Sequence, residues 1–546
     1  MEANRSAVPK PVNERVRDYG PGSEDKRLLK DALKRTVDRP VEIPLVIGGA
    51  AVTTGRKIEM RPPHDRTTIL GSYNAGGRDE ALAAVGAALA AKRGWAETPW
   101  LDRAAIFLKA AELLAGRHRY EIIAATMLGQ SKNVFQAEID AACELADYLR
   151  FNVAALSRIY ADEPDQQSSG AWTRLDFRPL DGFVFAVTPF NFTAIGGNLP
   201  SAPAMMGNTV VWKPASTAVL SAHVFMRILN EAGLPPGVIN MVPGRGSEVG
   251  DPVVGHKDLA GVHFTGSNGV FDGIWYQVGV NIKQAVYLNY PRLVGETGGK
   301  GFVVAAPDAD PEVVATALFQ GAFEYQGQKC SAASRAYLPR SLWPAIRSRL
   351  SDMASNALVG DVADFRTFMG AVIDKAAFDS IVSYIEYAQA STAAKIVIGG
   401  DHDDRRGYFI RPTVIETADP GFRTMREEIF GPVLTVYVYA DREFAGTLDL
   451  VDATSPYALT GAVFSSDRSL VRLALGKLAQ AAGNFYINDK PTGAVVGQQP
   501  FGGARMSGTN DKAGSYLNLL RWTSPRTIKE NFDPPRGIAY PHMAEA

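Results

Sequence analysis

Two cysteines occur in the 546-residue chain, and only one has surroundings suited to nucleophilic chemistry. Cys330 lies in EYQGQKCSAASR, a polar, glycine-containing stretch that lacks the apolar periodicity of a core element. Cys143 lies in AEIDAACELADYLRF, where apolar residues recur every three or four positions and predict a core residue on an amphipathic helix. Cys330 is therefore the candidate nucleophile, and because the attacking species is a thiolate we expect a low thiol pKa.

Covalent catalysis by a thiol also requires a donor that stabilises the oxyanion and a base for the second half-reaction. Glu296 lies in the glycine-rich stretch LVGETGGKGF, where a lone carboxylate can act as that base, although a structural role is an equal alternative. Asn191 follows the apolar run FVFAVTPF, and the carboxyl end of a parallel strand is where such sheets bind ligands. Its side-chain NH2 is a neutral donor suited to an oxyanion.

A cysteine–histidine hydrolase and a metal enzyme are the competing interpretations. No histidine lies in a motif suited to pairing with Cys330, and His263 in AGVHFTG fits packing in a strand. The cluster DHDD at 401–404 follows two glycines and fits a solvated turn. HExxH and CxxC motifs are absent, so the sequence predicts no metal site.

The elements that must position these residues alternate between strands and helices. Helical patterns over 79–95, 102–118 and the Cys143 segment come first, and from residue 181 strand-like runs such as FVFAVTPF and TVVWKPA alternate with helical segments. A second series begins near Gly301 and continues to GNFYIND. Such alternation implies right-handed crossovers and parallel sheets covered on both faces.

Three segments fit neither series. The first 40 residues are charged and proline-punctuated, and we expect them to wrap the surface. The polar sequence of residues 162–180 predicts a hairpin. The C-terminal tail contains strand-like pieces but few apolar residues of its own for them to pack against. We expect the last two to form an oligomerisation arm.

Composition excludes several classes of protein. A formal net charge of −1 with 21% charged residues gives no basic patch for nucleic acid or an anionic membrane. No apolar run reaches the roughly 18 residues of a membrane span. The N-terminal sequence has no apolar signal region and two distant cysteines suggest no disulfide framework, so we expect a cytoplasmic protein.

The motifs PFNF, WKPA, FTGS, ETGGKG, GQKC, EEIFGPV and PFGG occur in an order that resembles the aldehyde dehydrogenase superfamily, over about residues 40–530. PFNFTAIGGNL, YQGQKCSA, SGTNDKAG and LLRWTSP are similar to its subfamily that oxidises L-glutamate γ-semialdehyde, formed from 1-pyrroline-5-carboxylate, to L-glutamate in proline degradation. The resemblance implies an α/β fold with a Rossmann-type NAD-binding domain (1–161 and 181–298), an α/β catalytic domain (299–515) and a small β oligomerisation arm (162–180 and 516–546).

The resemblance implies three catalytic roles. Cys330 attacks the aldehyde carbonyl, Asn191 and the Cys330 backbone N–H hold the oxyanion, and Glu296 activates the water that hydrolyses the thioester. The retained Glu296 argues against a CoA-acylating enzyme, which needs no hydrolytic base, and the three residues together argue against a non-catalytic protein on this fold.

The cofactor implied is NAD. The glycine pattern GRGSEVG at 244–250 is weak evidence, whereas FTGS opens a helix whose N-terminal amides favour a pyrophosphate. In the family Lys213 contacts the adenosine ribose, Glu428 the nicotinamide ribose, and Phe430 packs nearby. Many members carry glutamate where this chain has Ser216, so NAD rather than NADP follows from the subfamily resemblance. The remaining cofactor residues that we expect are Thr188, Gly266, Ser267, Asn268, Gly269 and Val270.

For the substrate, the resemblance implies a carboxylate anchor made by the backbone amides of Gly493 and Ala494 with the Ser331 hydroxyl. Ser331 alone fits a small packing residue nearly as well. Other residues expected along the tunnel are Phe192, Phe501, Glu138 and Lys329. A related acidic semialdehyde such as succinate semialdehyde is the alternative substrate. The partners implied are a second copy of the chain, as a homodimer or higher oligomer, and a proline dehydrogenase.

Overall fold

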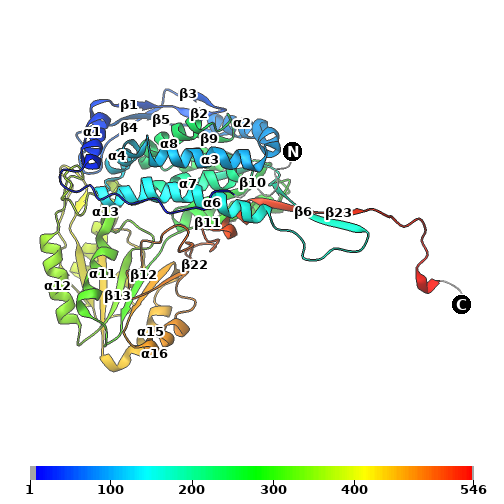
Figure 1. Cartoon of the computed structure of the whole chain (residues 1–546). Coiled ribbons are helices and arrows are strands. Elements are labelled where there is room, and N and C mark those ends of the chain that lie inside the picture. The colour runs from blue at the N-terminus through cyan, green and yellow to red at the C-terminus, as the bar shows by residue number, and fades with distance from the viewer. Residues whose placement is uncertain (1–7, 544–546) are drawn as a thin grey trace.

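Two seven-stranded sheets, each with helices on both faces, form the body of the computed structural model, which describes residues 8–543 (Figure 1). The predicted alternation of strands and helices in two series is thereby confirmed. None of the helices in the described residues combines the length and the apolar character needed to cross a bilayer.

The first sheet has the order β11-β10-β7-β8-β9-β2-β3, with its first five strands parallel and β2 and β3 antiparallel to their neighbours. The chain builds outward from β7 through β8 to β9 and then returns to place β10 on the other side of β7. Ligands bind at such a reversal, outside the carboxyl ends of the strands. The strands are β2 Leu45–Ile47, β3 Ala50–Val52, β7 Phe183–Val187, β8 Thr209–Lys213, β9 Ile239–Met241, β10 Leu259–Thr265 and β11 Arg292–Glu296.

Helices cover this sheet on both faces because alternate strand residues point to opposite sides. Phe183 and Phe185 pack in the core under α2, α9 and α10, whereas Val184 and Ala186 pack in the core with the remaining helices. The bounds are α2 Arg78–Glu97, α9 Gly246–Val254 and α10 Asn268–Lys283 on one face, and α3 Trp100–Ala115, α4 Arg119–Gln130, α6 Leu145–Tyr160, α7 Thr193–Met205 and α8 Val219–Ala232 on the other. The short α5 Val134–Ala137 leads into a π-helix, Glu138–Glu144. A smaller sheet joins β1 Val41–Ile43, β5 Gly71–Asn74 and β4 Lys57–Met60.

The second sheet has the order β14-β17-β18-β13-β12-β20-β21 and is parallel except for β14. Its strands are β12 Gly301–Ala305, β13 Ala333–Pro339, β14 Ala394–Ile398, β17 Thr413–Thr417, β18 Val433–Tyr439, β20 Thr460–Phe464 and β21 Asn484–Ile487. One face packs under α11 Pro311–Phe323 and α12 Trp343–Asn356, and the other under α13 Lys375–Ala390, α15 Phe444–Ala453 and α16 Arg468–Lys477. Shorter elements are α14 Arg423–Arg426, α17 Tyr516–Leu520, β15 His402–Asp403 with β16 Phe409–Ile410, and β19 Tyr457–Ala458 with β22 Ala504–Arg505.

A two-stranded ribbon projects from this body (Figure 1). Residues 171–179 form one strand, β6 Ala171–Pro179, which pairs along its whole length with β23 Thr523–Asn531. The hairpin predicted within 162–180 is therefore wrong, because the partner strand comes from the C-terminal tail. Trp172 and Phe532 are exposed on it, and the tail continues outward beyond β23 (Figure 1).

The N-terminal region contributes to the core more than its composition predicts. Helix α1, Glu24–Asp38, is capped by Ser23 and buries Leu29, Ala32 and Leu33, which lie on one face through their spacing of three and four residues. Of the residues before α1 that the structure describes, 8–20 form neither helix nor strand and follow the surface. The expectation that all of the first 40 residues wrap the surface is wrong for α1.

Candidate active site

The candidate site lies at the carboxyl ends of the first sheet, where the strand order reverses. Asn191 follows β7, Lys213 ends β8, and Gly266 with Ser267 follows β10. All four line a cavity of about 930 Å³ that Cys330 also lines. The second half of the chain thus supplies the candidate nucleophile to a cavity formed largely by the first half.

A strained turn presents Cys330 to the cavity. Three consecutive residues before it adopt left-handed backbone angles: Tyr325 (φ 52°), Gln326 (φ 56°) and Gly327 (φ 65°). A Cβ on Gly327 would lie 2.2 Å from the carbonyl oxygen of Gly431, so this position requires glycine. The Gln326 side chain holds the turn, because its amide donates to the carbonyls of Ser131 at 3.0 Å and Ala371 at 2.6 Å. Strain of this kind is common where a reactive group must be held.

Burial, together with the nearby carboxylates of Glu428 and Glu296, raises the pKa of Cys330 to about 12, against the lowering effect of its own N–H and that of Ser331. The expected low thiol pKa is therefore wrong for this structure. The thiol must lose its proton as it attacks, which requires a base in the site.

Asn191 and Glu296 supply the other two functions. The Asn191 side chain is buried and donates one N–H to the carbonyl of Gln328 at 3.0 Å, which leaves its second N–H for an oxyanion. Glu296 accepts a hydrogen bond from the Gly503 N–H at 3.0 Å. Burial raises the pKa of Glu296 well above its usual range, with a further rise from Asp511 and an opposing effect of Lys512. A carboxylate with a raised pKa is a stronger base than one in water.

One end of the cavity has the character of an anion site. Lys213 is largely buried, burial lowers its pKa, and within the described residues its ammonium contacts only the Pro214 carbonyl, at 3.4 Å. Ser267 caps α10 with extended backbone angles but, in the part of the chain described, without a side-chain bond to the first turn. The amides of that turn are therefore available to a ligand, and Gly269 and Val270 line the cavity there.

The nicotinamide end that the resemblance implies contains Glu428 and Phe430. Glu428 accepts from the Gly299 N–H at 2.7 Å, and burial raises its pKa to about 7 while Lys300 opposes that rise. Phe430 packs edge-on against Phe190 with ring centres 5.8 Å apart. Both residues line the cavity, as does Thr188.

The side chain of Asn268, a predicted cofactor residue, is hydrogen-bonded within the protein. Its amide donates to the Thr297 hydroxyl at 3.1 Å and accepts from the Gly298 N–H at 3.2 Å. Its side chain thus braces the loop that follows Glu296.

Among the predicted substrate residues, Ser331 contacts the loop that contains Gly493 and Ala494. The hydroxyls of Ser331 and Thr492 lie 2.8 Å apart, which brings Gly493 and Ala494 next to the segment that carries the nucleophile. Gly493 has a φ of +93°, which favours glycine. The Lys132 ammonium lies 4.2 Å from the centre of the Phe192 ring. Phe501 exchanges two backbone hydrogen bonds with Ala513.

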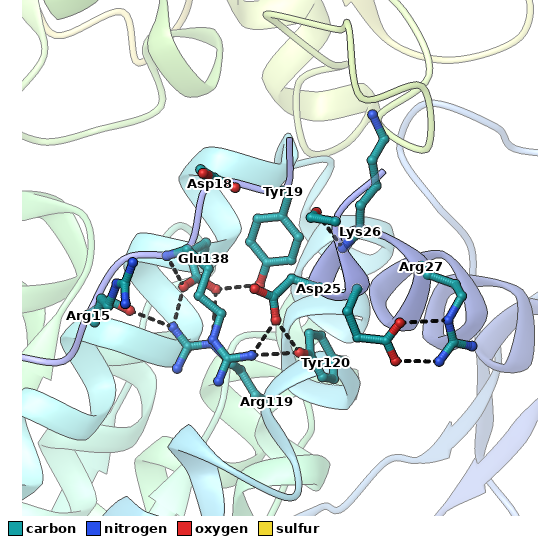
Figure 2. A network of polar contacts seen from close by, with 12 residues as sticks. Arg15, Asp18, Tyr19, Asp25, Lys26, Arg27, Arg119, Tyr120 and Glu138 are labelled. Atoms are coloured by element: carbon teal, nitrogen blue, oxygen red, sulfur yellow. Dashed lines mark hydrogen bonds and ion pairs between the residues drawn. The ribbon is translucent and has the colours of Figure 1, made fainter. Parts of the chain in front are cut away.

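Lys329 and Glu138 are both engaged in ion pairs. Lys329 is buried and pairs with Glu324 at 3.1 Å. Glu138 pairs with Arg119 and accepts from the Tyr19 hydroxyl at 2.6 Å, so its carboxylate faces the N-terminal segment (Figure 2). The structure does not bring Glu138 together with the tunnel residues, because this arginine and tyrosine consume its acceptors.

Glu144 lies closer to the site and was missed from the sequence. Among the described side chains it has no hydrogen-bond or ionic partner, and burial, with the Asp140 carboxylate, raises its pKa to about 8. Tyr148 is near both, since burial raises its pKa and the charges of Glu144, Glu296 and Cys330 raise it as well. Residues 138–144 form a π-helix, which shifts the face that each side chain takes relative to an α-helix.

Cys143 is a core residue, as the sequence predicts. It is 5% exposed, and burial raises its thiol pKa. Its sulfur contacts Arg119 at 3.6 Å and Glu138 at 3.7 Å, and it belongs to the packing around that pair.

Comparison with known proteins gives concordant results. Residues 51–528 match the model of the aldehyde dehydrogenase family. Delta-1-pyrroline-5-carboxylate dehydrogenase, mitochondrial, of Dictyostelium discoideum is 51% identical, over 99% of this chain and 97% of the relative, and the human enzyme of the same name is 48% identical over 98% and 94%. The crystal structure of the Mycobacterium tuberculosis Delta-pyrroline-5-carboxylate dehydrogenase bound with NAD is 52% identical, with a TM-score of 0.96 and full coverage of both chains.

These names correct one expectation. The relatives from Dictyostelium discoideum and human are named as mitochondrial, which overturns the cytoplasmic location expected from the sequence. The composition of a chain and its lack of an apolar signal region carry little information about this kind of compartment.

Proposed function

The chain belongs to the aldehyde dehydrogenase family, and from this we propose that it oxidises L-glutamate γ-semialdehyde, formed from 1-pyrroline-5-carboxylate, to L-glutamate with NAD in proline degradation. Relatives with this activity in their names match nearly the full chain at 48–52% identity, which supports this substrate over succinate semialdehyde. The structural observation that carries the proposal is the Ser331–Thr492 contact, which joins the segment of Cys330 to the loop that contains Gly493 and Ala494.

The cavity residues fit a dinucleotide. Lys213 offers a buried ammonium, the first turn of α10 offers free amides for a pyrophosphate, and Glu428 offers a carboxylate to ribose hydroxyls. NAD, when bound, accepts the hydride that leaves the substrate carbon. The remaining chemistry belongs to the chain's own residues.

In the first half-reaction Cys330 bonds to the aldehyde carbon and its thiol proton passes to a base. The carbonyl oxygen becomes an alkoxide that receives the free N–H of Asn191 and the N–H of Cys330. Re-formation of the C=O bond then expels hydride and leaves a thioester on Cys330.

In the second half-reaction Glu296 takes a proton from water as the water attacks the thioester carbonyl. The C–S bond breaks, L-glutamate leaves, and the thiol regains a proton. The raised pKa of Glu296 suits a base, and its hydrogen bond to Gly503 holds the carboxylate in place. A CoA-acylating enzyme would need no such group.

The substrate's far end carries an α-carboxylate and an α-ammonium. We assign the carboxylate to the amides of Gly493 and Ala494 and the Ser331 hydroxyl, and the ammonium to Glu144, which lacks a partner among the described residues. Phe192 and Phe501 would contact the aliphatic chain between the two ends.

The proposal also assigns a role to each domain of the chain. Residues 1–161 with 181–298 bind the cofactor, and 299–515 carry the nucleophile. The segments 162–180 and 516–546, which include the ribbon β6–β23, join one copy of the chain to another, since the ribbon exposes aromatic residues such as Trp172 and Phe532. A proline dehydrogenase remains a predicted source of the substrate.

The test is NADH production with glutamate semialdehyde, succinate semialdehyde and pentanal, an aldehyde of similar length without charged groups. We expect the highest kcat/KM with glutamate semialdehyde. Equal or higher efficiency with succinate semialdehyde would refute the substrate assignment while leaving the family chemistry intact.

A further inference from the structure

Residues 8–20 cross the surface of the first half as an irregular strap that leads into α1. Its C-terminal end is anchored in the core, where Tyr19 is 4% exposed and its hydroxyl donates to Glu138 (Figure 2). Arg119 donates to the Arg15 carbonyl at 2.9 Å on the same anchor (Figure 2). The strap is therefore fixed along its path, although it forms neither helix nor strand.

Asn13 is the point where the strap meets the loop that follows β21. Its side-chain amide donates to the Val496 carbonyl at 2.7 Å and to the Asp147 carboxylate of α6 at 2.8 Å. Its side-chain oxygen accepts from the Gln498 amide at 3.1 Å. One residue thus joins the strap, α6 and the loop.

The neighbouring Glu14 fixes the position of Asn13. Its backbone N–H donates to Asp147 at 2.7 Å, and its carboxylate pairs with Arg119 and Arg150, each at 2.8 Å. The Arg119 side chain is fully buried and that of Glu14 is 17% exposed, so solvent screens these pairs less than it screens surface pairs.

Besides the contact with Asn13, the loop is held by hydrogen bonds within itself: the Val495 N–H donates to the Gln499 side chain at 2.8 Å, and the Val495 carbonyl accepts from the N–H groups of Gln498 and Gln499. Gly493 and Val495 are exposed, and Gly497 has a φ of +85° at a place where a Cβ would lie 2.2 Å from the Phe151 ring. Val496, whose carbonyl Asn13 holds, is only two residues from Ala494. A displaced Val496 carbonyl would therefore reorient the amides of Gly493 and Ala494.

We propose that Asn13 is a positioning residue that sets the carboxylate-binding loop and thereby the selectivity for carboxylate-bearing aldehydes. The proposal rests on the proposed function, because it assumes that Gly493 and Ala494 bind the substrate carboxylate. An aldehyde without a carboxylate does not use those amides, so its oxidation is independent of Asn13.

The test compares Asn13→Ala with wild type in the full chain, using glutamate semialdehyde and pentanal. We expect KM for glutamate semialdehyde to rise about tenfold, the scale of lost hydrogen bonds at a charged site, with kcat/KM for pentanal and KM for NAD unchanged. Gln498→Ala, at an exposed position that does not endanger folding, should shift the same ratio in the same direction by a smaller factor. Val12→Ala is the matched control, because Val12 lies on the strap and is 70% exposed.

Two outcomes would overturn the role of Asn13: an equal loss of kcat/KM with both aldehydes, or an unchanged ratio in both Asn13→Ala and Gln498→Ala. If the wild type does not prefer glutamate semialdehyde to pentanal, the proposed function fails, and the role of Asn13 fails with it. If both variants keep the wild-type preference for glutamate semialdehyde, the proposed function is supported and only the positioning role of Asn13 is refuted.

Discussion

The hydroxyls of Ser331 and Thr492 lie 2.8 Å apart, which joins the residue after the candidate nucleophile to the residue before Gly493. Both side chains are buried. Ser331 precedes β13 and Thr492 follows β21, so two strands of one sheet set the separation between Cys330 and the loop. If the loop binds the substrate carboxylate as we propose, we expect this fixed separation to select aldehydes by the distance between the carbonyl carbon and the carboxylate.

Cys330→Ala should abolish NADH formation with every aldehyde, because the other cysteine lies in the core around Arg119 and Glu138. Steady-state assays monitored by NADH absorbance check this. Cys143→Ala is the matched control, and it should lower stability by a modest amount without removing activity. Loss of catalysis in the Cys143 variant at a temperature where it is folded would contradict the contrast between the two thiols.

The reaction of Cys330 with iodoacetamide should accelerate steadily with pH. Burial raises the pKa of this thiol to about 12, so the thiolate is the minor form at neutral pH and its fraction grows about tenfold per pH unit below the pKa. Mass spectrometry of the Cys330 peptide, between about pH 7 and pH 9, measures the rate in the free enzyme. A plateau at neutral pH would mean that the site stabilises the thiolate.

Glu296→Gln should separate the two half-reactions. The variant keeps the shape of the side chain but cannot take a proton from water, so one equivalent of NADH should form in a burst and turnover should then stall. Rapid-mixing absorbance records the burst, and intact-mass analysis detects the acyl group on Cys330. Full turnover in this variant would assign deacylation to another base.

Asn191→Ala should slow the first half-reaction instead. The loss of one oxyanion donor lowers kcat by roughly 10² to 10³. The burst of NADH should itself become slow, without accumulation of the thioester. This distinguishes it from Glu296→Gln, and a fast burst in Asn191→Ala would remove Asn191 from the oxyanion site.

The sequence predicts the location of a site residue where that residue directly follows a strand of the first sheet. The carboxyl ends of parallel strands meet at one edge, so Asn191, Lys213 and Ser267 could be placed together from the order of strands alone. Glu138 and Glu144 show the opposite case. Glu138 is expected near the tunnel only from the resemblance, and Glu144 is not expected at all, because local periodicity does not predict the π-helix over 138–144 that shifts the face each side chain takes.

Long-range pairing is the other feature that local patterns do not contain. Strand β6 has a strand-like sequence, yet its partner β23 lies more than 340 residues later in the chain. A hairpin with its own neighbour is the simplest local expectation, and only the tertiary fold replaces it. The thiol pKa also depends on tertiary structure, because two of the groups that raise it, Glu428 and Glu296, are distant from Cys330 in the sequence.

Ala494→Pro tests the carboxylate anchor by removing one backbone donor. The substrate carboxylate leaves bulk water as it enters the site, and a buried charge without partners is costly, so each donor that converges on it contributes to binding. Proline lacks an N–H, and the loss of one hydrogen bond to a charged group should lower kcat/KM for glutamate semialdehyde about 10- to 100-fold. The same change should leave pentanal oxidation and NAD affinity near wild-type values, since neither uses that amide.

Ala494→Gly retains the N–H and serves as the control for altered loop flexibility. A structure with L-glutamate bound gives the direct measurement. A carboxylate beyond hydrogen-bond distance of Gly493, Ala494 and Ser331 would refute the anchor, because these donors can stabilise the substrate's charge only by direct contact.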